Sequence, residues 1–265
     1  MSALFCLAGR RALVTGANSP IGSAIALGLA GQGADLVLHH FAGAHAANRL
    51  AGEVQGLGRK AAVVEADFLD ADGVGSFAGR VAADHGPIDI LVACAAVERR
   101  QPWAETTPRH VEAHVAANFT ALITLAAVLV PPMAERGWGR VVAIGSVMAA
   151  RPRSETVAYA ATKAAQLTAV RAIARDVAAR GVTMNVVAPG AIETEHTAER
   201  YSEPAFRRAV TAKIPAGRPG LPGDVVGPVL FLCSDAAAYV TGALIPVDGG
   251  WTIGDAPGAL PGEAA

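Results

Sequence analysis

The segment Arg11–Gly22, with the sequence RALVTGANSPIG, decides the fold of this chain. It begins with a short apolar run, Ala12–Val14, typical of a buried strand, and continues into a turn that contains two glycines. A strand that turns tightly into a helix brings free backbone N–H groups and the positive helix end together, as a dinucleotide pyrophosphate requires. Gly16 lets the backbone approach a phosphate, and Gly22 lets the helix pack closely on the sheet.

Ser19 and Pro20 indicate where that helix starts. Serine is favoured as the N-cap, and proline is favoured at the first helical position, where its missing N–H is not needed. The alternative is an ordinary strand-to-helix turn. The chain has 29 glycines, so pairs of glycines at this spacing occur by chance. The turn alone therefore leaves dinucleotide binding open.

Short apolar runs alternate with helix-like stretches as far as about residue 190, which is typical of βαβ units. Buried strands are expected at Ala12–Val14, Asp35–Leu38, Ala61–Val64, Ile88–Ala93, Val141–Ile144, Thr183–Val187 and Ala243–Val247. Helices are expected at Ile21–Gly31, His45–Leu57, Gly73–Asp84, Arg109–Glu135, Val157–Ala179, Glu203–Lys213 and Val225–Cys233, with Gly181 as a C-terminal cap. The alternation predicts an α/β fold: one doubly wound (Rossmann) domain with a mostly parallel seven-stranded sheet and helices on both faces.

No linker divides the chain, so residues 1–265 are expected to form one dinucleotide-binding and catalytic domain. Residues 191–215 interrupt the alternation with a polar, charged segment, which predicts a substrate lid; a plain surface loop is the alternative. The tail 252–265 is rich in glycine, alanine and proline and is expected to be loosely ordered.

Composition excludes several classes of partner. The chain has 22 Lys+Arg against 23 Asp+Glu, and this near-neutral balance argues against binding to nucleic acid or to an anionic membrane. A hydrophobic share of 52% excludes intrinsic disorder as the main state, and no uninterrupted apolar stretch approaches the length of a membrane span. Cys6, Cys94 and Cys233 lie too far apart for metal ligation and predict no disulfide framework. We expect a cytoplasmic protein without a signal peptide or a metal.

A rarer constellation lies in the second half of the chain. Ser146 ends a strand, and Tyr159 and Lys163 stand four residues apart, so they share one face of a helix. A nearby ammonium favours the phenolate and is expected to lower the tyrosine pKa, which makes Tyr159 a usable general acid/base. Because the chain has only 3 tyrosines, chance is a poor explanation; a surface Tyr/Lys pair is the alternative.

With these residues in place, the sequence resembles the short-chain dehydrogenase/reductase family, in its Tyr-x-x-x-Lys, 3-oxoacyl-reductase-like form, over about residues 8–251. The likeness rests on the following features, in the family's order: Thr15–Gly22, Asp67, GPIDILV at 86–92, Asn118, Ser146, YAATK at 159–163, Pro189-Gly190, Ile214-Pro215, Gly217-Arg218, Thr241-Gly242 and VDGG at 247–250. The resemblance implies an NAD(P)(H)-dependent oxidoreductase that transfers hydride between the nicotinamide and a small carbonyl or secondary alcohol.

The resemblance also implies a catalytic tetrad. Tyr159 would exchange the proton, Ser146 would orient the reacting oxygen, Lys163 would hold the nicotinamide ribose, and Asn118 would support a water that relays protons. The implied cofactor-binding residues are Gly16, Asn18, Ser19, Ile21, Gly22, His40, Asp67, Phe68, Ala95, Tyr159, Lys163, Pro189, Gly190, Ile192 and Thr194. Asp67 and Phe68 would meet the adenine, and Thr194 would reach the carboxamide. Family members also lead us to expect a homo-oligomer, a tetramer or a dimer.

The chain departs from the family pattern at two places. Pro20 replaces the second turn glycine, and Ala93-Cys94-Ala95-Ala96 replaces the usual Asn-Asn-Ala-Gly. These changes remove an N–H from the phosphate loop and a bracing side chain after a strand. They motivate one alternative, a non-catalytic dinucleotide sensor or scaffold on the same fold. A second alternative is epimerisation or another non-redox step.

The end of the second strand bears on the choice of cofactor. It reads Leu38-His39-His40-Phe41 and has no carboxylate to bind a ribose 2′-OH. His40 and Ser19 are able to hydrogen-bond a 2′-phosphate, although no arginine stands nearby. We therefore predict a preference for NADP(H) over NAD(H).

Other charged residues allow more than one interpretation. His110 and His114, four apart on a predicted helix, form an incomplete metal site and favour a solvated helix face. Arg151 and Arg153 suit an anionic substrate, a rim or a subunit contact. The loops that contain Glu98-Arg99-Arg100 and Glu193, Glu195 and His196 occupy substrate-facing places in family members. The Ala-rich helix 157–179 suits the core or a subunit interface.

Overall fold

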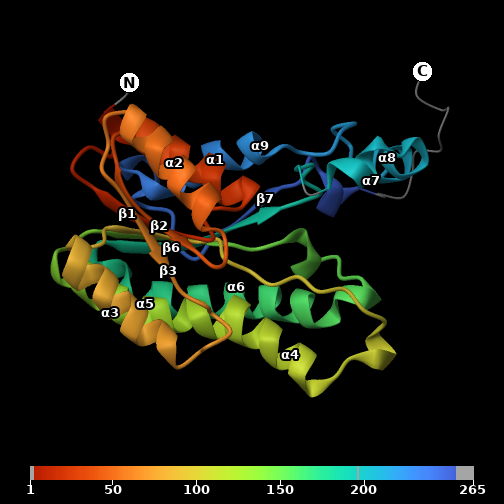
Figure 1. Cartoon of the computed structure of the whole chain (residues 1–265), viewed down its shortest axis with the longest axis horizontal. Coiled ribbons are helices and arrows are strands. Elements are labelled where there is room, and N and C mark those ends of the chain that lie inside the picture. Colours follow the sequence, from red (N-terminus) through yellow and green to blue (C-terminus); the bar gives the residue numbers. More distant parts are fainter. Residues whose placement is uncertain (1–2, 196, 255–265) are drawn as a thin grey trace.

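The computed structural model describes residues 3–195 and 197–254, which form a sheet between two layers of helices (Figure 1). The strands are β1 (Arg11–Thr15), β2 (Asp35–His40), β3 (Ala61–Glu65), β4 (Ile90–Ala93), β5 (Gly139–Ile144), β6 (Val182–Pro189) and β7 (Leu244–Val247). They pair in the order β3-β2-β1-β4-β5-β6-β7, and all six pairings are parallel. The predicted doubly wound α/β fold is confirmed.

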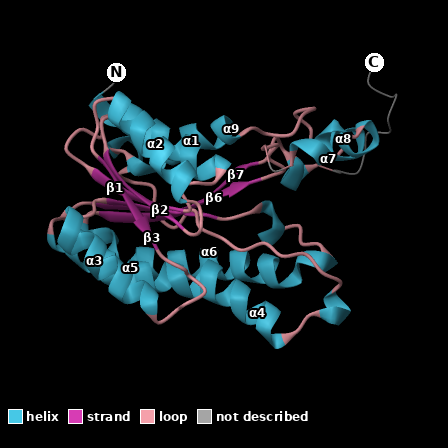
Figure 2. Ribbon diagram, in the orientation of Figure 1, coloured by secondary structure: helices cyan, strands magenta, loops and turns pink. Residues whose placement is uncertain are grey.

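The helices divide between the two faces of the sheet (Figure 2). One layer contains α1 (Pro20–Gly31), α2 (Ala44–Gly56) and α9 (Pro222–Cys233). The other contains α3 (Gly73–His85), α4 (Pro108–His114), α5 (Ala121–Glu135) and α6 (Val157–Val177). Two short helices, α7 (Ala198–Ser202) and α8 (Pro204–Thr211), stand apart at the right in Figure 1, within the segment predicted to be a lid.

Alternate side chains of each central strand enter two separate cores. Leu13 and Leu91 pack beneath α3, α5 and α6, whereas Val14 and Val92 pack against the layer of α1 and α9. Successive side chains of a strand point to opposite faces, so a strand covered on both faces must be apolar throughout. This requirement explains the uninterrupted apolar runs in the sequence.

The helix expected over Arg109–Glu135 is not uniform. A π-helical turn, Val115–Thr120, separates α4 from α5 and contains Asn118. The whole helical stretch Pro108–Glu135 is long and apolar enough to cross a membrane, but half of its apolar window is buried inside the molecule. Leu125 and Met133 pack in the core, so the stretch behaves as a core helix of a globular domain.

The connection that follows β1 leads to β2, whereas the connection that follows the neighbouring β4 leads to β5 on the opposite side. Such a switch point opens a crevice at the carboxyl ends of the strands. The end of β1 lies beside the end of β4, with Thr15 opposite Ala93, so both following loops enter this crevice. Thr252, the first residue of the predicted tail, donates its N–H to Asp248 at 2.7 Å. The rest of that prediction, 255–265, lies outside the described residues.

Candidate active site

A cavity of about 580 Å³ lies at the carboxyl ends of the strands and spans the switch point. Its size is that of a small-molecule or cofactor site. The predicted site residues that line it are Gly16, Asn18, Ser19, Ile21, Ala95, Ser146, Tyr159, Lys163, Pro189, Gly190, Ile192 and Thr194. The predicted residues that do not line it are Gly22, His40, Asp67, Phe68 and Asn118. The structure thus brings the phosphate turn and the Tyr/Lys pair to one cavity.

The phosphate turn is closed by its own residues. Gly16 has a φ of 63°, a conformation that favours glycine. Ser19 caps α1: its Oγ donates to Gly16 O at 2.8 Å and accepts from Gly22 N–H at 3.1 Å. A Cβ on Gly22 would collide with the Gly16 carbonyl, so Gly22 supports the turn from behind. Pro20 occupies the first helical position, as predicted, and the turn fits a pyrophosphate at the start of α1.

His39 holds the turn against the sheet, a role that sequence reasoning missed. Its Nδ1 accepts from Gly16 N–H at 3.1 Å, so its Nε2, 3.1 Å from Ala66 O, donates to that carbonyl. The ring stacks on Phe68 with centroids 4.2 Å apart. Burial lowers the pKa of His39 to about 4, so the ring is neutral at physiological pH.

The neighbouring His40, predicted to contact the cofactor, does not line the cavity. It is buried, its Nδ1 accepts from Gly43 N–H at 3.3 Å, and His39 rather than His40 lines the cavity. Phe68 faces His39, and Asp67 accepts from Leu69 N–H at 2.9 Å. Two adjacent histidines at a strand end point to opposite faces, and the sequence does not say which one meets the cavity.

The altered segment after β4 is braced from β1 instead. Thr15 Oγ1 accepts from both Cys94 N–H and Ala95 N–H, each at 3.0 Å. A Cβ on Gly16 would lie 2.8 Å from Ala95 Cα, so the two loops touch at their backbones. Cys94 lines the cavity with its thiol 3.9 Å from Ser19 Oγ, and burial raises the pKa of that thiol. The departures from the family pattern therefore leave a closely packed phosphate loop.

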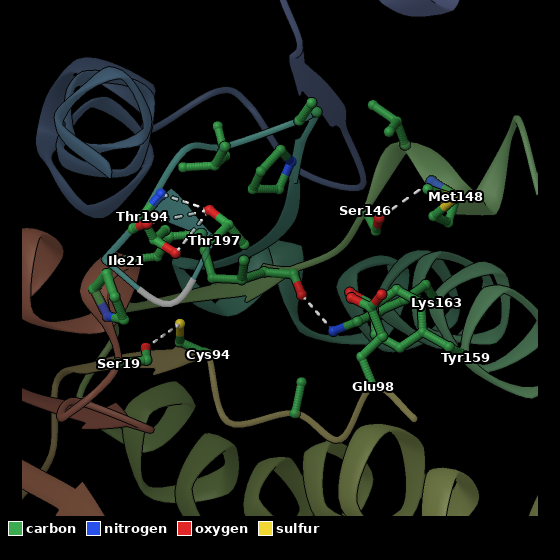
Figure 3. A pocket seen from close by; sticks show the side chains of 18 of the residues that line it. Ser19, Ile21, Cys94, Glu98, Ser146, Met148, Tyr159, Lys163, Thr194 and Thr197 are labelled. Carbon is green, nitrogen blue, oxygen red and sulfur yellow. Dashed lines mark hydrogen bonds between the residues drawn. The ribbon is translucent and has the colours of Figure 1, made fainter. Parts of the chain in front are cut away.

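Ser146, Tyr159 and Lys163 line the other side of the cavity (Figure 3). Ser146 follows β5 and caps a short turn, accepting from Met148 N–H at 3.1 Å. Helix α6 presents Tyr159, whose pKa the Ser146 side chain lowers. One turn later, the buried Lys163 Nζ donates to Ile144 O at 2.7 Å and lies 5.5 Å from the Tyr159 ring centroid.

Burial dominates the electrostatics of this group. It raises the pKa of Tyr159, Glu98 raises it further, and the Ser146 side chain lowers it. Burial also lowers the pKa of Lys163 to about 8. The expectation that Lys163 lowers the Tyr159 pKa is wrong: Lys163 is not among the groups that shift it, and the loss of water around the phenol raises it. Tyr159 is protonated at neutral pH, ready to act as an acid.

Asn118 braces the loop that follows β4. Its Oδ1 accepts from Val97 N–H at 2.7 Å, and its Nδ2 donates to Val97 O at 2.9 Å and to Thr162 Oγ1 at 3.2 Å. Its backbone carbonyl accepts from Gln166 Nε2 at 2.5 Å. These bonds direct Glu98, the residue after Val97, into the cavity. The support of a relay water by Asn118 stays a prediction.

His114 supports the same loop, and the expectation of a solvated helix face is wrong for this residue. It is buried, its Nε2 accepts from Arg99 N–H at 3.2 Å, and its Nδ1 donates to His110 O at 2.8 Å. Both ring nitrogens are therefore occupied. Within residues 3–195 and 197–254, no group of histidine, cysteine and acidic side chains has the arrangement of a metal site.

The substrate end of the cavity is built from loops and the two short helices. Sequence reasoning named Arg153 and Arg100 there but not the residues from α7 and α8, because short lid helices carry no strong periodicity. The lining side chains at this end are Glu98, Arg100, Met148, Arg153, Arg200, Tyr201, Phe206, Val210 and Trp251. Glu193 pairs with Arg207 at 2.6 Å instead of facing the cavity. His196, also named above, lies outside the described residues.

Comparisons with known proteins agree with this site. A family model described as enoyl-(acyl carrier protein) reductase matches residues 16–252. The 2-dehydro-3-deoxy-D-gluconate 5-dehydrogenase of Pseudoalteromonas atlantica is 37% identical over 247 residues, which cover 93% of this chain and 97% of that protein.

Two solved structures extend the likeness to three dimensions. A putative NAD(P)-dependent gluconate 5-dehydrogenase from Beutenbergia cavernae, with bound NADP, is 38% identical with a TM-score of 0.89, covering 94% of this chain and 99% of that one. A 3-oxoacyl-(acyl-carrier-protein) reductase from Agrobacterium tumefaciens C58, with NADP bound, is 36% identical with a TM-score of 0.88, covering 93% and 95%. The chain belongs to the short-chain dehydrogenase/reductase family of NAD(P)-dependent oxidoreductases, which act on CH–OH and C=O groups.

Proposed function

We propose that this chain transfers hydride between NADP(H) and a small carbonyl or secondary-alcohol substrate, with Tyr159 as the general acid/base. One observation carries the proposal: Ser146, Tyr159 and Lys163 line the same cavity as the glycine turn at the start of α1. A reacting oxygen between Ser146 and Tyr159 has a proton donor within reach and a cofactor site beside it.

Each of the chain's own groups has a task in this scheme. NADP(H), when bound, supplies or accepts the hydride. Ser146 orients the substrate oxygen, and Tyr159 gives it a proton in reduction. The Lys163 ammonium stabilises the phenolate that remains and is placed to contact the nicotinamide ribose. Asn118 holds the substrate loop, and Pro189, Gly190, Ile192 and Thr194 line the nicotinamide end of the cavity.

The two directions of the reaction are expected to have different pH profiles. Reduction needs protonated Tyr159, whose pKa is raised, and charged Lys163, whose pKa is about 8. Reduction should therefore be flat from pH 6 to 7 and fall as Lys163 loses its proton above about pH 8. Oxidation needs the phenolate beside charged Lys163, so it should rise with pH up to about pH 8, where reduction is still flat. Initial rates in both directions from pH 6 to 10 test this, and parallel profiles would contradict it.

Support for NADP(H) comes from the part of the cavity next to β2. There the lining side chains are Asn18, Ser19, His39 and Phe41, none of them acidic. A carboxylate at this place would repel a 2′-phosphate, whereas an NAD-selective site needs one for the ribose 2′-OH. The two relatives solved with NADP agree with this preference.

Phe41→Asp is expected to weaken NADPH binding by more than about tenfold and to leave NADH binding little changed, because like charges brought together cost several kcal/mol. Phe41 is 54% exposed, so the substitution leaves the core intact. Fluorescence titration of both cofactors measures the ratio. Phe41→Asn is the neutral control, and equal losses for the two cofactors would count against the assignment.

Cofactor turnover separates the proposal from its two alternatives. The experiment is a screen of carbonyl and alcohol compounds with NADPH or NADP⁺, with product analysis. Net oxidation or reduction of the cofactor matched by product supports hydride transfer. Tight cofactor binding without any turnover would favour a sensor, and product without net cofactor change would favour epimerisation.

The chain is further proposed to act in the cytoplasm as a homo-oligomer, a tetramer or a dimer. Large apolar side chains are exposed in the layer of α4 to α6, at Trp103, Val111, Val115 and Val157. A second copy of the chain that covers this layer would remove them from water. Light scattering gives the number of chains, and a monomer at working concentration would contradict the proposal.

A further inference from the structure

The charged side chains that line the cavity are unbalanced. In the described part of the chain they are the cations Arg100, Arg153, Lys163 and Arg200 and the single carboxylate Glu98. Arg100 pairs with Glu98 at 2.7 Å, and Lys163 belongs to the catalytic group. Two guanidinium groups, those of Arg153 and Arg200, remain at the substrate end without compensation from another lining residue.

Neither guanidinium is held by a strong ion pair. The Arg153 guanidinium lies 3.7 Å from Glu155, but both side chains are more than a third exposed, and such a pair contributes little. The same guanidinium lies 5.9 Å from the centroid of the Trp251 ring in the cavity wall. Arg200, on α7, lies 4.6 Å above the Phe206 ring and has no carboxylate partner within the described ranges. Both groups are available to a ligand.

Tyr201 lies in the same part of the cavity wall as Arg200. It is 5% exposed and lines the cavity, and its ring lies 5.3 Å from the Phe206 ring that Arg200 covers. Arg207 lies 5.6 Å from the Tyr201 ring centroid, but it is paired with Glu193 at 2.6 Å. Burial raises the pKa of Tyr201, Glu193 raises it further, and Arg200, Arg207 and Arg153 lower it. The substrate end of the cavity therefore combines a phenol with two cations that no lining carboxylate balances.

Because these cations and this phenol line one cavity without a balancing carboxylate, we infer that Arg153, Arg200 and Tyr201 form a subsite for the carboxylate of a small hydroxy-acid or keto-acid substrate. The inference rests on the proposed function, because the other end of the same molecule places its reacting carbon at Tyr159. Guanidinium groups match the two oxygens of a carboxylate, and the phenol supplies a third donor. A neutral polyol of the same length offers no charge to this subsite.

The test compares matched acids and neutral polyols. Wild-type protein with NADP⁺ is assayed with five- and six-carbon aldonates, each beside its alditol, for example D-gluconate beside D-glucitol. The variants are Arg153→Gln, Arg200→Gln and the double variant. Arg208→Gln, an exposed change on α8 outside the cavity, is the control. NADPH affinity is measured for every variant, because arginines that serve the cofactor phosphates would alter it.

We expect wild type to favour an acid over its alditol, and each single variant to lose roughly 10- to 100-fold in kcat/KM for the acid, the range for removal of a charge-assisted hydrogen bond. The alditol rate, NADPH affinity and the Arg208→Gln control should change less than about threefold. Equal losses for acid and alditol, or weaker NADPH binding, would overturn the subsite.

Calorimetry measures binding of the same acid and alditol to the Tyr159→Phe variant in the presence of NADP⁺. It therefore tests the subsite without turnover. Acid binding that depends on Arg153 supports the subsite even if no oxidation occurs. Absence of acid binding overturns the subsite and leaves the proposed function standing if other carbonyl compounds are reduced. The failures of the two proposals are thereby distinguishable.

Discussion

Tyr159→Phe is expected to lower kcat by roughly 1000-fold, within the range of 10²- to 10⁴-fold that general acid/base catalysis contributes, while NADPH still binds. The variant removes only the Tyr159 hydroxyl and leaves the ring in the cavity wall. Ser146 still orients a substrate oxygen, but no group next to it has a proton to give. The measurement is kcat with a substrate found in the screen, beside NADPH titration.

Tyr239→Phe is the matched control, because Tyr239 is fully exposed and its hydroxyl has no task in the site. It should keep wild-type kcat. If Tyr159→Phe kept more than a tenth of wild-type turnover, Tyr159 would not be the acid. If it lost NADPH binding as well, the loss of rate would say nothing specific about proton transfer, and a structural role would be the better interpretation.

Lys163→Met is expected to lower activity and raise stability at once. Activity should fall by roughly 100-fold, as for loss of a group that stabilises the Tyr159 phenolate. Stability should rise because Lys163 is 2% exposed and its pKa is lowered to about 8 by burial. Each pKa unit is worth roughly 1.4 kcal/mol, and the lost bond to Ile144 costs about 1 kcal/mol, so the net gain at pH 7 is about 2 kcal/mol.

The sign of this effect depends on pH in a defined way. Between about pH 8 and the ordinary lysine pKa of 10.5, an unfolded lysine holds a proton that folded Lys163 has released, so wild-type stability rises with pH in this window. The advantage of Lys163→Met should therefore shrink from pH 8 to 10. Denaturant unfolding at pH 7 and 10 measures it, with the exposed Lys60→Met as control. A variant less stable than wild type at pH 7 would contradict the account.

The fold was predictable because its signals are local or periodic. Ser19, Pro20 and Gly22 specify the start of α1, and the apolar strands report burial on both faces. Tyr159 and Lys163 were found because two scarce residues stand one helical turn apart. In these cases the residues that determine the structure lie close together in the sequence, so a short stretch is enough to predict it.

Other parts of the site depend on contacts between distant segments. The sequence at the end of β2 does not predict that His39 accepts a hydrogen bond from Gly16 N–H. The sequence predicts that His114 lies on the surface. Only the folded chain shows that its ring accepts a hydrogen bond from Arg99 N–H. The raised pKa of Tyr159 follows from burial by loops that no spacing rule places. Such roles arise from tertiary packing, which a single sequence does not encode locally.

The transfer of label from cofactor to product tests the central claim most directly. NADPH that bears deuterium at the transferable C4 position is incubated with the protein and a carbonyl substrate from the screen, and the product is analysed by mass spectrometry and NMR. Hydride transfer predicts one deuterium on the carbinol carbon of the product, equal in amount to the NADPH consumed. Product without that deuterium, or with hydrogen at that carbon taken from solvent, would contradict the account.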